Sequence, residues 1–146
     1  MKNHTRHVLF AAAIAVAVSG IAQAHDGDGR NECSEATLRG LYVFNASGFN
    51  IVNGVPQPKA IVEFIRFNGD GTLTVPAATS SINGVVARSP AHGLGTYMAA
   101  ADCTGSLAFG PPGPTFDLFI SPRGLELRMM QTGPGSPVMQ GIAEKL

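Results

Sequence analysis

Apolar and polar residues alternate along most of the chain after residue 38. The segment 116–120 shows this clearly, with Phe116, Leu118 and Ile120 on one side, and the segment 125–129 repeats the pattern. A period of two is typical of β-strands that bury one face. The sequence therefore predicts β-structure, without a long amphipathic helix.

Turn signals separate the predicted strands. Asn68-Gly69-Asp70-Gly71 follows the most apolar segment, and Asn83-Gly84 interrupts a segment that could form one bent strand or two short ones. Such pairs supply the positive φ that hairpin turns require. The expected strands cover residues 41–44, 59–67, 72–75, 77–88, 95–102, 106–109, 115–121, 125–129 and 138–143. Short connections between about eight strands predict an all-β fold, a single antiparallel up-and-down β-barrel, whose closure removes exposed edges.

Residues 1–24 have the organisation of a secretory signal peptide. Lys2 and Arg6 precede the apolar run 8–18, and Ala22-Gln23-Ala24 fits a cleavage site between small residues. The run is too short to span a bilayer as a helix, which favours a cleaved signal peptide. The alternative is an uncleaved membrane anchor.

Cleavage after Ala24 predicts three regions. These are the signal peptide at 1–24, a polar N-terminal segment at 25–38 and the β-barrel domain at 39–146. We expect no integral membrane segment after signal removal, and a secreted or periplasmic location.

The two cysteines, Cys33 and Cys103, are predicted to form a disulfide, because an oxidising compartment favours pairing. The alternative is two free thiols. The bridge would close a loop of about 71 residues and stabilise the fold by about 4 kcal/mol on the chain-entropy model.

Composition excludes several classes of function. A length of 146 residues suits one domain, and ten basic residues balance ten acidic ones, which argues against nucleic-acid binding. The sequence contains no phosphate-binding loop, no dinucleotide fingerprint and no G-x-S-x-G elbow. We therefore expect neither a cofactor nor a nucleic-acid partner.

Several short motifs carry a resemblance to known barrels. They are L-R-G-L-Y-V-F at 38–44, F-N-G-D-G-T-L at 67–73, G-T-Y-M-A-A-A-D-C-T-G-S at 95–106, F-D-L-F-I at 116–120, L-E-L-R-M-M-Q-T at 125–132 and G-I-A at 141–143. With them the chain resembles small exported bacterial proteins of unassigned activity, which are similar to allene-oxide-cyclase-like and lipocalin-like β-barrels. The resemblance implies the barrel fold and suggests isomerase or cyclase chemistry on a hydrophobic substrate. Its motifs are turn and strand residues rather than a catalytic signature.

Glu63 is the first candidate for a functional side chain, because it lies within the most apolar predicted strand. Parity groups Glu63 with Ile65 and groups Arg66 with Phe64, so one of these two charges should point into the barrel. A carboxyl group in an apolar interior has a raised pKa, which suits acid/base chemistry. Alternatively the inward charge is paired, with Arg128 as one partner, or lies near the open rim.

Tyr97 is the second catalytic candidate, because a tyrosine hydroxyl beside a carboxylate can handle a proton. Buried tyrosines more often donate a hydrogen bond to a neighbour. The candidate ligand-binding residues are Phe64, Arg66, Tyr42 and Arg128.

An eight-stranded barrel can hold one small ligand or fill its interior with side chains. The sequence therefore predicts a protein that binds a small hydrophobic ligand. The alternatives are an isomerase- or cyclase-like enzyme that uses a carboxylate in the lumen, and a filled barrel that acts as a structural or interaction protein.

The candidate metal ligands are His25 and His92. If cleavage follows Ala24, the α-amine and imidazole of His25 could chelate Cu(II), with His92 as a second imidazole. Otherwise His25 is the first residue of a polar tail. The acidic fragment 26–32 lacks the remaining ligands of a calcium loop, so no metal site is predicted there.

Overall fold

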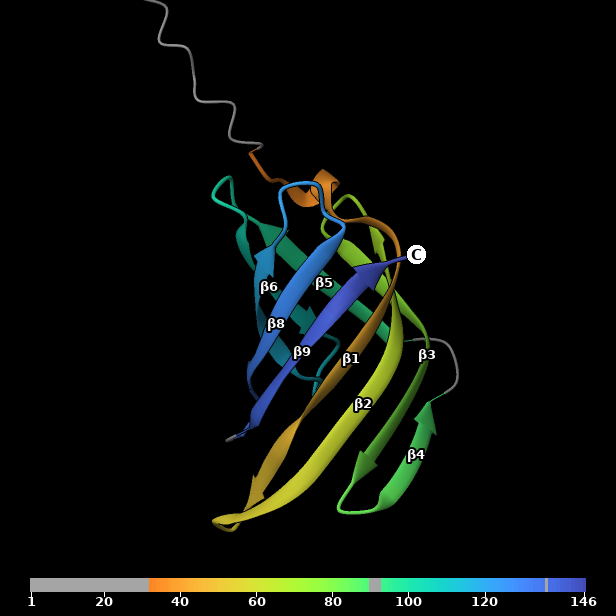
Figure 1. Cartoon of the computed structure of the whole chain (residues 1–146), viewed down its shortest axis with the longest axis vertical. Coiled ribbons are helices and arrows are strands. Elements are labelled where there is room, and N and C mark those ends of the chain that lie inside the picture. The colour runs from red at the N-terminus through yellow and green to blue at the C-terminus, as the bar shows by residue number, and fades with distance from the viewer. Residues whose placement is uncertain (1–31, 90–92, 136) are drawn as a thin grey trace, which may run out of the picture.

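Nine antiparallel strands and one short 3-10 helix make up the described part of the protein (Figure 1). The computed structural model describes residues 32–89, 93–135 and 137–146. The elements are η1 (Glu35–Thr37), β1 (Arg39–Val52), β2 (Val55–Asn68), β3 (Thr72–Ile82), β4 (Val85–Ser89), β5 (Gly93–Ala99), β6 (Thr104–Phe109), β7 (Thr115–Ile120), β8 (Glu126–Gly133) and β9 (Val138–Lys145). The predicted signal peptide, His25 and His92 lie outside the described residues.

Eight of the strands close into a barrel. The ladder runs β2-β1-β9-β8-β7-β6-β5-β3, and β3 pairs with β2 to complete the circuit. The ninth strand, β4, pairs with β3 beside the barrel. The predicted up-and-down barrel of about eight strands is therefore confirmed. Asn83-Gly84 forms a hairpin turn with φ of 50° and 83°, so this segment is two strands rather than one bent strand.

The first hairpin is much longer than the sequence pattern predicted. β1 and β2 each contain 14 residues and meet at Asn53-Gly54, where φ values of 50° and 78° suit a type I′ turn. Pro56 and Pro58 do not interrupt β2, because the ladder with β3 begins only at Lys59. Proline has no N–H to donate, so a strand tolerates it where no neighbouring strand offers a carbonyl acceptor on that side.

The long hairpin extends past the barrel wall as an arm. We use this name for residues 49–60 and 78–89, which belong to β1, β2, β3 and β4 (Figure 1). The arm borders one end of the barrel interior.

Large side chains fill most of that interior. The largest fully buried ones are Tyr42, Phe44, Phe67, Leu38, Ile65, Leu73, Leu107, Leu118, Leu127 and Met129. The predicted inward residues Phe116, Leu118 and Ile120 are all buried, which confirms the alternation in β7. Leu125 is exposed instead, because it lies in the turn before β8 begins.

The segment before β1 covers the barrel end that lies opposite the arm. Cys33 and Cys103 form the predicted disulfide, with 4.9 Å between their Cα atoms. Leu38, next to η1, is completely buried. The disulfide, the buried Leu38 side chain and hydrogen bonds from the Tyr97 hydroxyl to the carbonyls of Glu35 and Leu38 therefore anchor the described part of this segment to the barrel.

Candidate binding pocket

Glu63 points into the barrel and Arg66 points out of it. The buried side chains of β2 are Glu63, Ile65 and Phe67. Only 8% of the surface of Glu63 is accessible to solvent. Phe64 and Arg66 occupy the alternate, exposed positions. The structure thus decides the question of parity that the sequence left open.

Glu63 lines a cavity of about 240 Å³ inside the barrel, at the end next to the arm. Its apolar lining comes from Ile61, Val75, Ala78, Phe109, Pro114, Phe116 and Met139, and its polar lining from Lys59, Glu63, Ser80 and Ser89. Gly93 completes the lining, and a Cβ there would lie 2.9 Å from the Val75 Cβ. An apolar cavity of about 150 Å³ already accommodates benzene, whereas drug-sized ligands occupy about 300 Å³ or more.

Burial in this cavity changes the acidity of Glu63. Desolvation raises its pKa from 4.5 to about 7, and the positive charge of Lys59 lowers it only in part. In the described part of the chain, the Glu63 carboxyl group makes no hydrogen bond and no ion pair within 4 Å. No buried side-chain N or O atom there lacks a partner, so the Glu63 oxygens keep contact with the open space of the pocket. Near neutral pH the pocket therefore contains a carboxyl group that is present in both protonation states and has no hydrogen-bond partner from the protein.

Lys59 is held by a different residue. Its Nζ lies 3.4 Å from Gln131 Oε1, and Gln131 Nε2 donates to the Gly133 carbonyl at 3.0 Å. Burial lowers the pKa of Lys59, and Glu63 acts in the opposite direction. Sequence reasoning missed Gln131, although it continues the inward alternation of Leu127 and Met129 in β8.

Three of the predicted ligand-binding residues lie on the outside of the barrel. Phe64, Arg66 and Arg128 are all exposed. Arg128 forms an ion pair with Glu126 at 3.3 Å, so the suggested pairing of Glu63 with Arg128 is wrong. The physical reason is register, because a residue whose strand neighbours face inward must itself face outward.

The two tyrosines are buried but have structural partners. The Tyr42 hydroxyl donates to the Gly124 carbonyl, and burial raises the Tyr42 pKa to about 12. The Tyr97 hydroxyl accepts from the Gly69 N–H at 3.0 Å and lies 2.8 and 2.9 Å from the carbonyls of Glu35 and Leu38.

Burial raises the Tyr97 pKa as well. Neither Tyr42 nor Tyr97 lines the pocket. The structure therefore does not bring Tyr97 together with Glu63 in one catalytic site.

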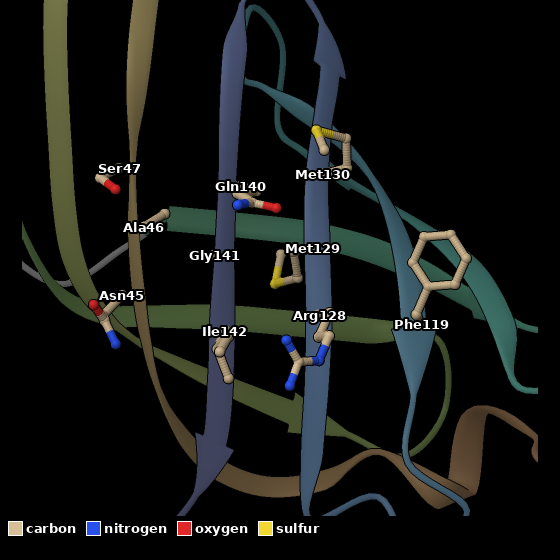
Figure 2. Close-up of a pocket in the computed structure, with 10 residues that line it drawn as sticks. All are labelled: Asn45, Ala46, Ser47, Phe119, Arg128, Met129, Met130, Gln140, Gly141 and Ile142. Atoms are coloured by element: carbon tan, nitrogen blue, oxygen red, sulfur yellow. The ribbon is translucent and has the colours of Figure 1, made fainter.

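A second depression lies on the outer wall of the barrel (Figure 2). It measures about 420 Å³ and is lined by Asn45, Ala46, Ser47, Phe119, Arg128, Met129, Met130, Gln140, Gly141 and Ile142. Figure 2 shows these residues on four neighbouring strands, β1, β9, β8 and β7. Its charged side chain, Arg128, is exposed and paired. The interior pocket is the better candidate, because its carboxyl group is desolvated and lacks a partner.

Within residues 32–89, 93–135 and 137–146, no group of three or more His, Cys, Asp or Glu side chains is placed to hold a metal ion. No helix in the same residues is long and apolar enough to cross a membrane.

Comparison of the chain with protein-family models, curated proteins and solved structures finds no match. The resemblance to allene-oxide-cyclase-like and lipocalin-like barrels stays a prediction.

Proposed function

We propose that this protein binds one small, largely apolar ligand in the interior pocket, with the polar group of the ligand against Glu63. The observation that carries the proposal is the largely buried Glu63 carboxyl group, which has no protein hydrogen-bond partner in the described residues and lines a mostly apolar pocket. Burial in a mostly apolar pocket leaves this carboxyl group only partly hydrated, so a ligand that hydrogen-bonds to it replaces weak solvation with a direct partner.

The charges of the pocket favour a neutral polar group on the ligand. A cationic amine on the ligand would be attracted by the Glu63 carboxylate but repelled by Lys59. A carboxylate on the ligand would be attracted by Lys59 but repelled by Glu63. A hydroxyl group can donate to the ionised Glu63 and accept from the protonated one. We therefore infer a ligand slightly larger than benzene that carries a hydroxyl or a similar neutral group.

We also propose that the protein is exported. The Cys33–Cys103 disulfide supports this, because disulfides persist in oxidising compartments. The signal-like pattern of residues 1–24 supports it independently.

The isomerase- or cyclase-like alternative receives less support from the pocket. Such a reaction needs a second group that exchanges a proton with the substrate. The Tyr97 hydroxyl lies outside the pocket and is engaged with three backbone groups. Lys59 is the other titratable group that lines the pocket, and its ammonium group donates to Gln131 Oε1 at 3.4 Å. The pocket of about 240 Å³ shows that side chains leave room at the arm end of the barrel, although they fill most of the remaining interior.

The experiment is a pair of NMR titrations of the disulfide-bonded protein, one with benzyl alcohol and one with toluene. In the wild type we expect amide shifts around β2 and β7 and tighter binding of benzyl alcohol. Glu63→Leu should weaken benzyl alcohol binding and strengthen toluene binding, because the partner of the hydroxyl is lost and the wall becomes apolar.

The matched control is Arg66→Leu, which changes an outward side chain of the same strand and should leave both affinities unchanged. Equal effects of the two substitutions, or shifts confined to the outer depression, would contradict the proposal.

A further inference from the structure

β4 lies outside the closed barrel and has one open edge. Its ladder joins it to β3, and all five of its residues are exposed. Figure 1 shows β4 at the margin of the arm, with β3 on one side. Barrel closure removes strand edges, so β4 reintroduces an edge that closure would otherwise have removed.

The β3–β4 hairpin determines which backbone groups face this edge. The two-residue turn Asn83-Gly84 makes Ile82 and Val85 a hydrogen-bonded pair, and such pairs alternate along an antiparallel ladder. The odd-numbered residues of β4 therefore bond to β3. The N–H and C=O groups of Val86 and Arg88 point to the open edge.

The neighbouring open stretch of β2 is protected, whereas the edge of β4 is not. Pro56 and Pro58 lie opposite Ile51 and Phe49, which are non-hydrogen-bonded positions of the β1–β2 ladder, so both ring nitrogens face away from β1. In agreement, the Pro58 carbonyl accepts from the Asn83 N–H on that side at 2.8 Å. Prolines at edge positions remove the donors that a new strand would need, and β4 (VVARS) contains none.

We propose that β4 pairs antiparallel with β4 of a second copy of this chain, which joins the two arms into one continuous sheet. Centring the pair on Ala87 places Val86 opposite the partner's Arg88. Both residues face outward, so this register forms four backbone hydrogen bonds and satisfies every outward group of Val86 and Arg88.

Side chains favour the same register. It sets each arginine across from a valine, so that the aliphatic stem of Arg88 can cover the partner's Val86. Val86, which is 52% exposed, would lose solvent contact. A register centred on Arg88 would instead place two like charges directly opposite each other. Because β4 has only five residues, the interface is small and the dimer is weak and concentration-dependent.

The test is sedimentation velocity of the mature, disulfide-bonded protein at concentrations from about 1 μM to about 1 mM, the range in which weak dimers dissociate. We expect a monomer–dimer equilibrium. Val86→Arg should weaken the dimer, since it puts a second cation opposite Arg88, and Val86→Glu should tighten it. Val86→Pro removes two of the four hydrogen bonds and should raise the dissociation constant about tenfold or more.

Val62 provides a matched control, because it is 55% exposed on the outer face of a strand with partners on both sides. Val62→Arg and Val62→Glu should leave the dissociation constant unchanged. A protein that is monomeric at every concentration overturns the proposal. So does a dimer that responds equally to arginine and glutamate at position 86. This comparison still decides the matter if Val86→Pro fails to fold.

Discussion

Lys59 and Glu63 lie four residues apart on the inner side of β2, yet the Lys59 ammonium contacts Gln131 Oε1 at 3.4 Å rather than the Glu63 carboxylate. Lys59 and Glu63 belong to β2 and Gln131 belongs to β8, which is not a neighbour of β2 in the sheet. These side chains approach one another because the sheet closes into a barrel. Because Lys59 is held elsewhere, Glu63 is desolvated without full compensation and its pKa is about 7. This arrangement makes the charge of the pocket responsive to pH near neutrality.

The raised pKa of Glu63 predicts a loss of stability with increasing pH. Between about pH 4.5 and 7 the folded protein binds more protons at Glu63 than the unfolded chain, so the free energy of unfolding falls as pH rises through this window. The full effect is about 3 kcal/mol. Urea unfolding at pH 5 and pH 8 measures it.

Glu63→Gln is the control for this prediction, since it keeps the shape of the side chain and removes its charge. The variant should be more stable than the wild type at pH 8 and should lose the slope between pH 4.5 and 7. If the free energy of unfolding of Glu63→Gln still falls between pH 4.5 and 7 as in the wild type, a group other than Glu63 causes the pH dependence.

The hydroxyl of Tyr97 is predicted to hold the N-terminal segment in place. Tyr97→Phe leaves the ring packed against Phe67 but removes the partner of the Gly69 N–H and of two carbonyls. We expect a loss of about 1–3 kcal/mol in the free energy of unfolding. Ligand binding should not change, because Tyr97 does not line the pocket. A loss of binding at unchanged stability would instead assign Tyr97 to the site.

The disulfide is predicted to be a major source of stability. It joins residues 70 positions apart, so the double variant Cys33→Ala/Cys103→Ala should lose about 4 kcal/mol on the chain-entropy model. Equilibrium unfolding in urea measures the difference. Reductant should destabilise the wild type and leave the double variant unaffected; a wild type indifferent to reductant would argue against this role.

Gly141 is predicted to allow β9 and β1 to pack closely, because there is no room for a side chain at this position. A Cβ at this position would lie 2.5 Å from the Ala46 Cβ and 2.6 Å from the Phe44 ring. Gly141→Ala should therefore cost about 1–3 kcal/mol through overpacking. Gly110→Ala is the matched control, because its nearest contact is 3.4 Å from the Leu94 carbonyl, and its melting temperature should stay near that of the wild type.

The parts of the fold that depend on local chemistry could be predicted from the sequence. Alternation identified the buried face of β7. Asn83-Gly84 indicated a possible turn between β3 and β4 but left one bent strand as the alternative. The disulfide followed from having two cysteines in a chain with a signal-like start. The strand and turn signals lie within the elements that they predict, whereas the disulfide needed no local signal because the sequence contains only two cysteines.

Features that depend on contacts between distant strands could not be predicted in this way. Parity showed that Glu63 and Arg66 face opposite sides but did not show which one faces inward, because that depends on closure. The contact between Lys59 and Gln131 joins residues 72 positions apart. The length of β2 was missed because Pro56 and Pro58 are read as strand breakers until their position on an open edge is known.

The most direct test of the account is the pH titration of the Glu63 side-chain carbon by NMR, with and without benzyl alcohol. We predict a midpoint near pH 7 in the free protein, as burial requires, and a displacement of that midpoint when benzyl alcohol occupies the pocket. A midpoint near 4.5 that benzyl alcohol leaves unmoved would mean that Glu63 is solvated and takes no part in binding.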